Sequence, residues 1–354
     1  MRFLNRAATV LALLALCACS GMGASGNLSP TNLRGTSGSA RALPDEGASA
    51  LPGEGANALP GEGANALPGS QLACRFSAQQ GQASCTIAIN VIVSAIPNPN
   101  TPASAIPGLH PADLQNAYGL AARGSSGTVA IVDAYDAPAV ENDLGVYRNA
   151  FGLPACTTSN GCFRKVNQAG VSGAYPQTDA GWSQEIALDV EMVSAICPAC
   201  KILLVEANSA SLDDLGASVD RAASLGAVAI SNSYYAYEWS GETAEDMHYH
   251  HPGVAVTASS GDAAEPFYPA ASPYVTAVGG TSLSANGASW NESAWEYGGR
   301  GCSAFEALPA WQSGTPCAKR STVDLAAVAD PQTGVAIFDA VAGGWIVAGG
   351  TSVG

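Results

Sequence analysis

Nearly continuous apolar stretches alternate with helix-like stretches through the second half of this 354-residue chain. The clearest strand candidates are Thr128–Ala134 and Lys201–Ala207, followed by Val228–Ser231 and Val254–Ser260. A strand lacks an exposed polar face when both sides of its sheet are covered, which is usual for parallel sheets with helical crossovers. The pattern therefore predicts an α/β fold with a doubly wound, mostly parallel sheet.

Helical patterns fill the intervals between these strands. One begins near Pro138, which suits a first helical position, and another spans Glu185–Ile196 with apolar residues at helical spacing. A third opens at Ser211 in a start that resembles a capping box and closes at Gly226, and Gly241–His250 is also expected to be helical.

Three polar clusters follow strands or lie on adjoining elements. They are Asp133, Ser259-Ser-Gly-Asp262 and Gly349-Gly-Thr-Ser352. Because ligands of open α/β sheets bind at the carboxyl ends of strands, these clusters are candidates for a functional site.

Glu185 and Asp189 lie four residues apart and so share one face of the predicted helix. If that face is buried, the two carboxyl groups can share a proton and one pKa rises, which makes a general base. The alternative is a solvated acidic face that also holds Glu191.

Gly349-Gly-Thr-Ser352 predicts a tight glycine turn that presents a hydroxyl group, as serine nucleophiles require. A second copy, Gly279-Gly-Thr-Ser282, continues into a polar stretch and is interpreted as a turn. Either copy alone is a weak signal.

Six motifs occur in order through residues 107–354. They are Glu185-x-x-x-Asp189, Ser260-Gly-Asp262, Tyr274–Leu283, Phe305–Gln312, Asp324–Gly334 and Gly349-Gly-Thr-Ser352. The ordered set resembles the sedolisins, the serine-carboxyl peptidases that share the subtilisin fold, and His110–Tyr118 resembles the entry to their catalytic domain. The resemblance implies an exported endopeptidase that cleaves proteins or peptides at acid pH.

The resemblance also implies a role for four residues. Ser352 would be the nucleophile and Glu185 the general base, with Asp189 orienting Glu185 and Asp262 lining the oxyanion hole. A carboxylic acid donates a hydrogen bond to an oxyanion only while it is protonated, so this chemistry requires acid. Asp133 stands where a subtilisin keeps its catalytic Asp, but no His-Gly element accompanies it, and it is interpreted as structural.

The sequence departs from the sedolisins at both ends. Residues 20–105 are expected to form a linker in place of a large folded propeptide, and the chain stops two residues after Ser352. The family places a central helix and a calcium site after this serine, so we expect residues 106–354 to form an incomplete peptidase domain. Calcium is implied as a cofactor, with its ligands expected beyond Gly354. A catalytically inactive surface lipoprotein that retains the peptidase fold is the alternative function.

The N-terminal residues predict export. Arg2 and Arg6 precede a short apolar run, so residues 1–19 are expected to be a signal peptide. Leu16–Cys19 resembles a bacterial lipobox that would place a lipid on Cys19; simple secretion is the alternative. From Ala42 an eight-residue repeat, with Leu43, Leu51, Leu59 and Leu67 in step, predicts a flexible tether before a Pro-rich joint.

Eight cysteines remain after the signal peptide and fall into four sequence-local pairs: 74/85, 156/162, 197/200 and 302/317. In an exported protein this pattern favours four disulfides, although the sequence does not fix their pairing. A short hairpin is expected between Cys74 and Cys85. Cys197-Pro-Ala-Cys200 is also compatible with a redox protein, a third functional class.

The chain carries a net charge of −15, and residues after 105 hold 25 acidic and only nine basic side chains. This acidity argues against nucleic acid or an anionic membrane as a partner. No stretch after the signal peptide predicts a transmembrane span, and the protein is expected to be a monomer. His248, His250 and His251 lack a second ligand cluster, so a metal site there is not favoured.

Overall fold

A mostly parallel sheet runs through the computed structural model, which describes residues 67–74, 76–120 and 126–354. Its order is β12-β11-β9-β7-β4-β6-β5, with β15 beside β11, and only the β11–β12 pair is antiparallel. The strands are β4 (Thr128–Ala134), β5 (Phe163–Asn167), β6 (Lys201–Ala207), β7 (Ala229–Asn232), β9 (Ala255–Ser259), β11 (Thr276–Asn286), β12 (Ser289–Ala294) and β15 (Leu325–Val328).

Successive side chains of the central strands enter different hydrophobic clusters. On β4, Ala130 and Val132 belong to the largest cluster, whereas Ile131 packs in a second cluster with Leu204 of β6. Side chains alternate across a strand, so this division means that both faces of the sheet are buried. The predicted α/β class with a mostly parallel, doubly wound sheet is confirmed.

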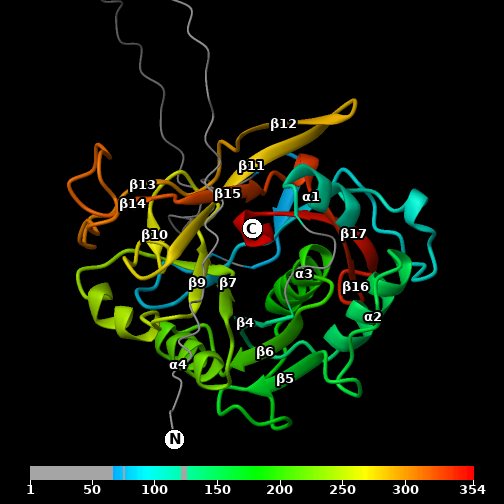
Figure 1. Cartoon of the computed structure of the whole chain (residues 1–354), viewed down its shortest axis with the longest axis horizontal. Coiled ribbons are helices and arrows are strands. Elements are labelled where there is room, and N and C mark those ends of the chain that lie inside the picture. The colour runs from blue at the N-terminus through cyan, green and yellow to red at the C-terminus, as the bar shows by residue number, and fades with distance from the viewer. Residues whose placement is uncertain (1–66, 75, 121–125) are drawn as a thin grey trace, which may run out of the picture. The chain divides into compact units, whose positions relative to one another are not determined.

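Helices cover both faces of this sheet. Helix α3 (Ala180–Ile196) and helix α4 (Leu212–Ser224) lie on opposite sides of β4 and β6 (Figure 1). The Ser211 hydroxyl accepts a hydrogen bond from the Asp214 amide at the start of α4, as its sequence predicted. The remaining helices are α1 (Pro111–Ala117) and α2 (Val140–Ala150), with 3₁₀ turns η1 (Ala103–Ala105), η2 (Glu242–His248), η3 (Pro331–Thr333) and η4 (Thr351–Val353).

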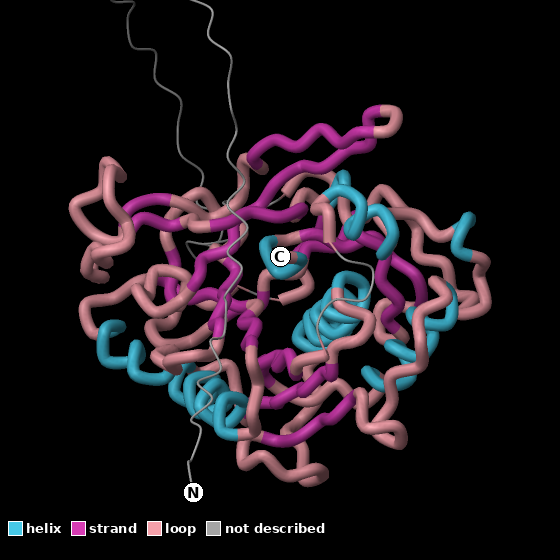
Figure 2. Tube along the Cα trace, in the orientation of Figure 1, coloured by secondary structure: helices cyan, strands magenta, loops and turns pink. Residues whose placement is uncertain are grey.

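Smaller antiparallel sheets surround the central one (Figure 2). One has the order β1-β3-β17-β16 and another the order β10-β8-β2, with β13 and β14 forming a separate pair. Their strands are β1 (Ser70–Leu72), β2 (Ser84–Cys85), β3 (Ala88–Asn90), β8 (Tyr234–Tyr237), β10 (Phe267–Tyr268), β13 (Gly301–Cys302), β14 (Ser321–Thr322), β16 (Val335–Asp339) and β17 (Gly344–Gly349).

Residues 70–90, which the sequence assigned to the linker, supply three of these strands. β3 pairs with β17, and β2 pairs with β8, so this segment is joined by hydrogen bonds to strands from residues 106–354. The domain division at residues 105 and 106 stays a prediction.

Four disulfides join the sequence-local cysteine pairs: Cys74–Cys85, Cys156–Cys162, Cys197–Cys200 and Cys302–Cys317. The predicted signal peptide, lipobox and first repeats lie outside the described residues. Within the described ranges, none of the helices combines the length and apolar character needed to cross a membrane.

Candidate active site

Helix α3 carries Glu185 and Asp189 into the interior. Asp179 begins the helix by accepting a hydrogen bond from the Trp182 amide at 3.0 Å. Glu185 and Asp189 lie on one helix face and are both buried, and Glu191 is buried as well. The solvated acidic face considered from the sequence is therefore wrong, because tertiary packing covers these carboxyl groups on α3.

Ser352 lies in the η4 turn directly after β17. The preceding Gly350 has a φ of 99°, and a Cβ atom there would lie 1.7 Å from the carbonyl oxygen of Thr86. Only glycine fits this close approach of two backbones. The turn holds the Ser352 side chain inside the protein, where it is buried.

Asp262 joins this turn from the end of β9. Its Oδ1 atom accepts hydrogen bonds from the amide and the hydroxyl of Thr351, at 2.8 and 2.9 Å. The Thr351 hydroxyl in turn accepts from the Gly261 amide at 3.0 Å. Oδ2 of Asp262 is buried and has no hydrogen-bond partner among the described residues, so it retains the capacity to donate a proton when the carboxyl group is neutral.

Thr86 connects the predicted site residues and was missed from the sequence. Its amide donates to Oε2 of Glu185 at 2.8 Å, and its hydroxyl contacts those of Ser352 and Ser259, the latter at 3.1 Å. Thr86 lies between β2 and β3 and follows Cys85 of a disulfide. No local sequence motif indicated that Thr86 would reach this site.

Burial dominates the electrostatics of the site. It raises the pKa of Glu185 well above its ordinary value, with Asp189 and then Asp133 adding repulsion, while the Ser352 hydroxyl lowers it. Burial also raises the pKa of Asp189 to about 8, partly offset by the Ser233 hydroxyl. The pKa of Asp262 rises to about 7, again through burial, against the two hydrogen bonds from Thr351. All three groups therefore favour their neutral forms in acid.

The chain as a whole is similar to known proteases. No family model matches the chain. Xanthomonalisin from Xanthomonas sp. (strain T-22) is 27% identical over 330 residues, an alignment that covers 73% of this chain and 39% of the relative. A solved Pseudomonas sedolisin, a serine-carboxyl proteinase complexed with pseudo-iodotyrostatin, superposes with a TM-score of 0.60 at 24% identity, covering 70% of this chain and 77% of that one.

The chain is similar in sequence to xanthomonalisin and in fold to the Pseudomonas sedolisin. Its fold is shared with the Pseudomonas sedolisin, as the ordered motifs implied. The chain spans only 39% of the length of xanthomonalisin, so activity, substrates and partners are treated below as proposals.

Within this sedolisin fold, Asp133 lies closer to the candidate site than its structural interpretation suggested. It is fully buried at the end of β4, and neither carboxyl oxygen has a hydrogen-bond partner among residues the structure describes. Burial raises its pKa well above the ordinary value, and Asp189 and then Glu206 add repulsion. Its place after the first strand was the available signal.

Calcium, implied by the sedolisin resemblance, has no fitting ligand set in the described ranges. There, no three His, Cys, Asp or Glu side chains are arranged to hold a metal ion. His248 and His251 instead both approach Asp220, at 2.7 and 3.1 Å. No step proposed below therefore runs through a metal.

Proposed function

We propose that this sedolisin relative is an exported serine-type endopeptidase that acts in acid, with Ser352 as nucleophile. Glu185 would be the general base, oriented by Asp189, and Asp262 would line the oxyanion hole. The observation that supports this proposal is that these side chains are brought together in one buried place. Thr86 touches both Ser352 and Glu185, while Asp262 binds the residue next to Ser352.

In the proposed reaction, the Ser352 hydroxyl gives its proton to the Glu185 carboxylate as its oxygen bonds to the scissile carbonyl carbon. The carbonyl electron pair moves onto oxygen, and a tetrahedral oxyanion forms. When this intermediate collapses, the peptide C–N bond breaks and Glu185 returns the proton to the leaving amine. Water then cleaves the acyl ester by the same route, which restores Ser352.

Asp262 would stabilise the oxyanion by hydrogen bonding. Thr351 occupies Oδ1, so a proton on Oδ2 is the one available for donation. With a pKa of about 7, Asp262 keeps this proton in acid and loses it above neutrality. Oxyanion stabilisation should therefore fail as the pH rises through 7.

Glu185 must ionise before it can accept the Ser352 proton. In the arrangement observed, Thr86 helps to exclude water and the pKa of Glu185 is strongly raised by burial. Withdrawal of Thr86 would admit water and lower that pKa, while the neutral Asp189 could still donate a hydrogen bond to the new carboxylate. The observed state is thus a closed one, and catalysis requires residues near Thr86 to move.

The proposed substrates are proteins or peptides bound in extended form. The edge of β8 already holds β2 in antiparallel pairing, with Ser84 opposite Tyr235 and Cys85 opposite Tyr234. An incoming peptide could form the same main-chain hydrogen bonds once β2 leaves, independently of its side chains. Export through residues 1–19 belongs to the same proposal, with lipid attachment at Cys19 or simple secretion as its two forms.

The second candidate function is a non-catalytic surface lipoprotein that retains the fold. The observation that favours it is the same Thr86 contact, because a hydroxyl already occupies the space beside Ser352. The two candidates differ in whether Ser352 can be acylated.

Hydrolysis of a denatured protein at about pH 4, near the ordinary pKa of a carboxyl group, tests the proposal. Ser352→Ala and Glu185→Gln should each lower the turnover rate by at least ~10³-fold, as for other serine peptidases. Ser282→Ala is the matched control, because Ser282 ends the second Gly-Gly-Thr-Ser copy and donates to Asp330 at 2.6 Å. Turnover that survives both site changes would overturn the proposal, and no acylation of the unaltered chain would favour the lipoprotein.

A further inference from the structure

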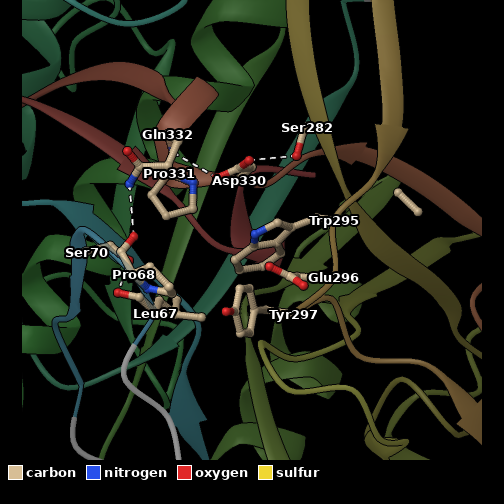
Figure 3. Close-up of a pocket in the computed structure, with 11 residues that line it drawn as sticks. Leu67, Pro68, Ser70, Ser282, Trp295, Glu296, Tyr297, Asp330, Pro331 and Gln332 are labelled. Atoms are coloured by element: carbon tan, nitrogen blue, oxygen red, sulfur yellow. Dashed lines mark hydrogen bonds between the residues drawn. The ribbon is translucent and has the colours of Figure 1, made fainter.

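A pocket of about 250 Å³ lies beside the last copy of the eight-residue repeat. Trp295 and Tyr297 line it together with Leu67 and Pro68, and the Leu67 side chain points toward Tyr297 (Figure 3). Leu67 keeps only 5% of its surface exposed and packs in a small hydrophobic cluster with Trp295. The last repeat is therefore a docked segment at this point.

The pocket contacts the main chain of the repeat as well as its leucine. Nε2 of Gln332 donates to the carbonyl oxygens of Pro68 and Gly69, at 3.2 and 3.3 Å. The Ser70 amide donates to the Leu67 carbonyl at 3.1 Å and closes a turn. Apart from the leucine side chain, these contacts are made through backbone groups that any Leu-Pro-Gly segment possesses.

The residue that follows Pro68 has to be glycine. Gly69 has a φ of 69°, and a Cβ atom there would lie 2.6 Å from Cδ1 of Ile92. Leu-Pro-Gly recurs at residues 51–53 and 59–61, whereas the first repeat reads Leu-Pro-Asp at residues 43–45. The chain therefore contains two further copies that satisfy this requirement, the nearer at residues 59–61, and a distant one that does not.

We propose that this pocket is a recognition site for Leu-Pro-Gly, and that residues 59–61 exchange with residues 67–69 as its occupant. The two copies are eight residues apart, and so short a connection gives an effective concentration of about 1 mM. A second molecule at micromolar concentration competes poorly with that, so the occupant comes from the same chain. When residues 59–61 occupy the pocket, Glu62 takes the place of Ser70, and the hydrogen bond from the Ser70 hydroxyl to the Leu67 carbonyl oxygen has no counterpart. Residues 67–69 are therefore the preferred occupant.

Photocrosslinking of the full chain tests this exchange. Glu296 is exposed and lines the pocket, so Glu296→p-benzoylphenylalanine places a reactive group there. Peptide mapping by mass spectrometry should find a major crosslink to residues 67–70 and a minor one to residues 59–62. Leu67→Ala should raise the ratio of the minor to the major crosslink by about tenfold or more, because the buried leucine holds the preferred copy in place.

Gly61→Asp is the matched control, since it gives residues 59–61 the aspartate of the first repeat. It should abolish the minor crosslink while leaving the major one, and near-ultraviolet circular dichroism should be unchanged. Crosslinks that stay confined to residues 67–70 in every variant, including Leu67→Ala, would overturn the proposal. So would crosslinks found only between ¹⁵N-labelled and unlabelled chains in a mixed sample, because the occupant would then be a second copy.

Discussion

Two of the clusters of buried carboxyl groups with raised pKa values in the described residues differ in their surroundings. The first surrounds Ser352, and the second lies where the end of β8 and the η2 turn meet the loop after β13. In the second group, Glu242 has a pKa of about 9 and Glu306 of about 8, in both cases mainly through burial. A raised pKa therefore does not distinguish the two groups.

The two groups differ in how fully the neighbouring serine hydroxyl is engaged and in how many carboxyl oxygens lack a partner. In the second group, Glu242 accepts from the Trp239 amide at 2.7 Å, and Glu238 accepts from the Ala304 amide at 3.1 Å and from the Ser303 hydroxyl. That hydroxyl also accepts from the Glu306 amide, so the nearest serine oxygen is fully engaged. The hydrogen bonds of the second group hold the loop after β13 in a fixed position.

Around Ser352, more carboxyl oxygens lack a partner. Both oxygens of Asp133 and Asp189 lack regular hydrogen bonds among the described residues, as does one oxygen each of Glu185 and Asp262. In the second group, this holds for one oxygen each of Glu242 and Glu306. Unused acceptors beside a hydroxyl in a glycine turn are what proton transfer requires. The comparison supports the proposed site, where a serine hydroxyl lies among several unpartnered carboxyl oxygens.

Asp262 gives the largest expected effect that separates the two groups. Asp262→Ala should lower kcat by about 10²–10³-fold, the usual cost of losing one oxyanion donor. Asp262→Asn supplies an amide donor that does not titrate, so it should retain part of the activity and lose the decline above about pH 7. Steady-state kinetics across pH measure both.

Glu306→Gln is the control from the second group and should leave kcat unchanged within about threefold. If Asp262→Ala also stayed within that range, or if Glu306→Gln matched its loss, the distinction between the groups would be wrong.

The dependence of stability on pH should be shared by both groups. Their folded pKa values lie above the ordinary 3.8 to 4.5, so the folded protein binds more protons than the unfolded chain between those values and about 9. The free energy of unfolding is then greatest in acid and falls as the pH rises, by up to about 1.4 kcal/mol per pH unit for each such group.

Urea unfolding followed by tryptophan fluorescence from about pH 4 to 8 measures this slope. Glu306→Gln should make the slope shallower because glutamine does not titrate. Stability that rises between these two pH values would contradict the assignment of neutral buried carboxyl groups.

The sequence predicted most of the strands and helices that a local residue pattern determines. The apolar stretches at Thr128–Ala134 and Lys201–Ala207 form β4 and β6 with the predicted boundaries. Their continuous apolar composition indicates that both faces are buried. The helix expected over Glu185–Ile196 begins five residues earlier, where Asp179 caps it. Gly241–His250 forms a 3₁₀ turn over a shorter span, since boundaries of short polar helices depend on tertiary contacts.

What the sequence could not supply was contact between distant segments. Thr86 reaches Ser352 across 266 positions, and nothing in its neighbourhood marks it as part of a site. Strands β16 and β17 were also missed, although they position the Gly349–Ser352 turn. Long-range antiparallel pairing leaves no periodic pattern in the sequence that identifies the partner strand. The carboxyl pair on α3 could be predicted, because its four-residue spacing is local.

Substitution of Thr86 should have the smallest of these effects. It tests whether the segment around Thr86 blocks access to Ser352. Thr86→Val keeps the shape of the side chain but removes the hydroxyl that contacts Ser352 and Ser259. The Ser352 hydroxyl is then left without that partner, at a cost that should favour withdrawal of the segment and speed acylation of Ser352 by about tenfold. The labelling rate with a fluorophosphonate probe measures this without relying on a substrate, and Thr86→Ser, which keeps the hydroxyl, is the control. Equal rates in both variants would mean that some other element limits access to Ser352, and the contrast with the second group would then rest on Asp262 alone.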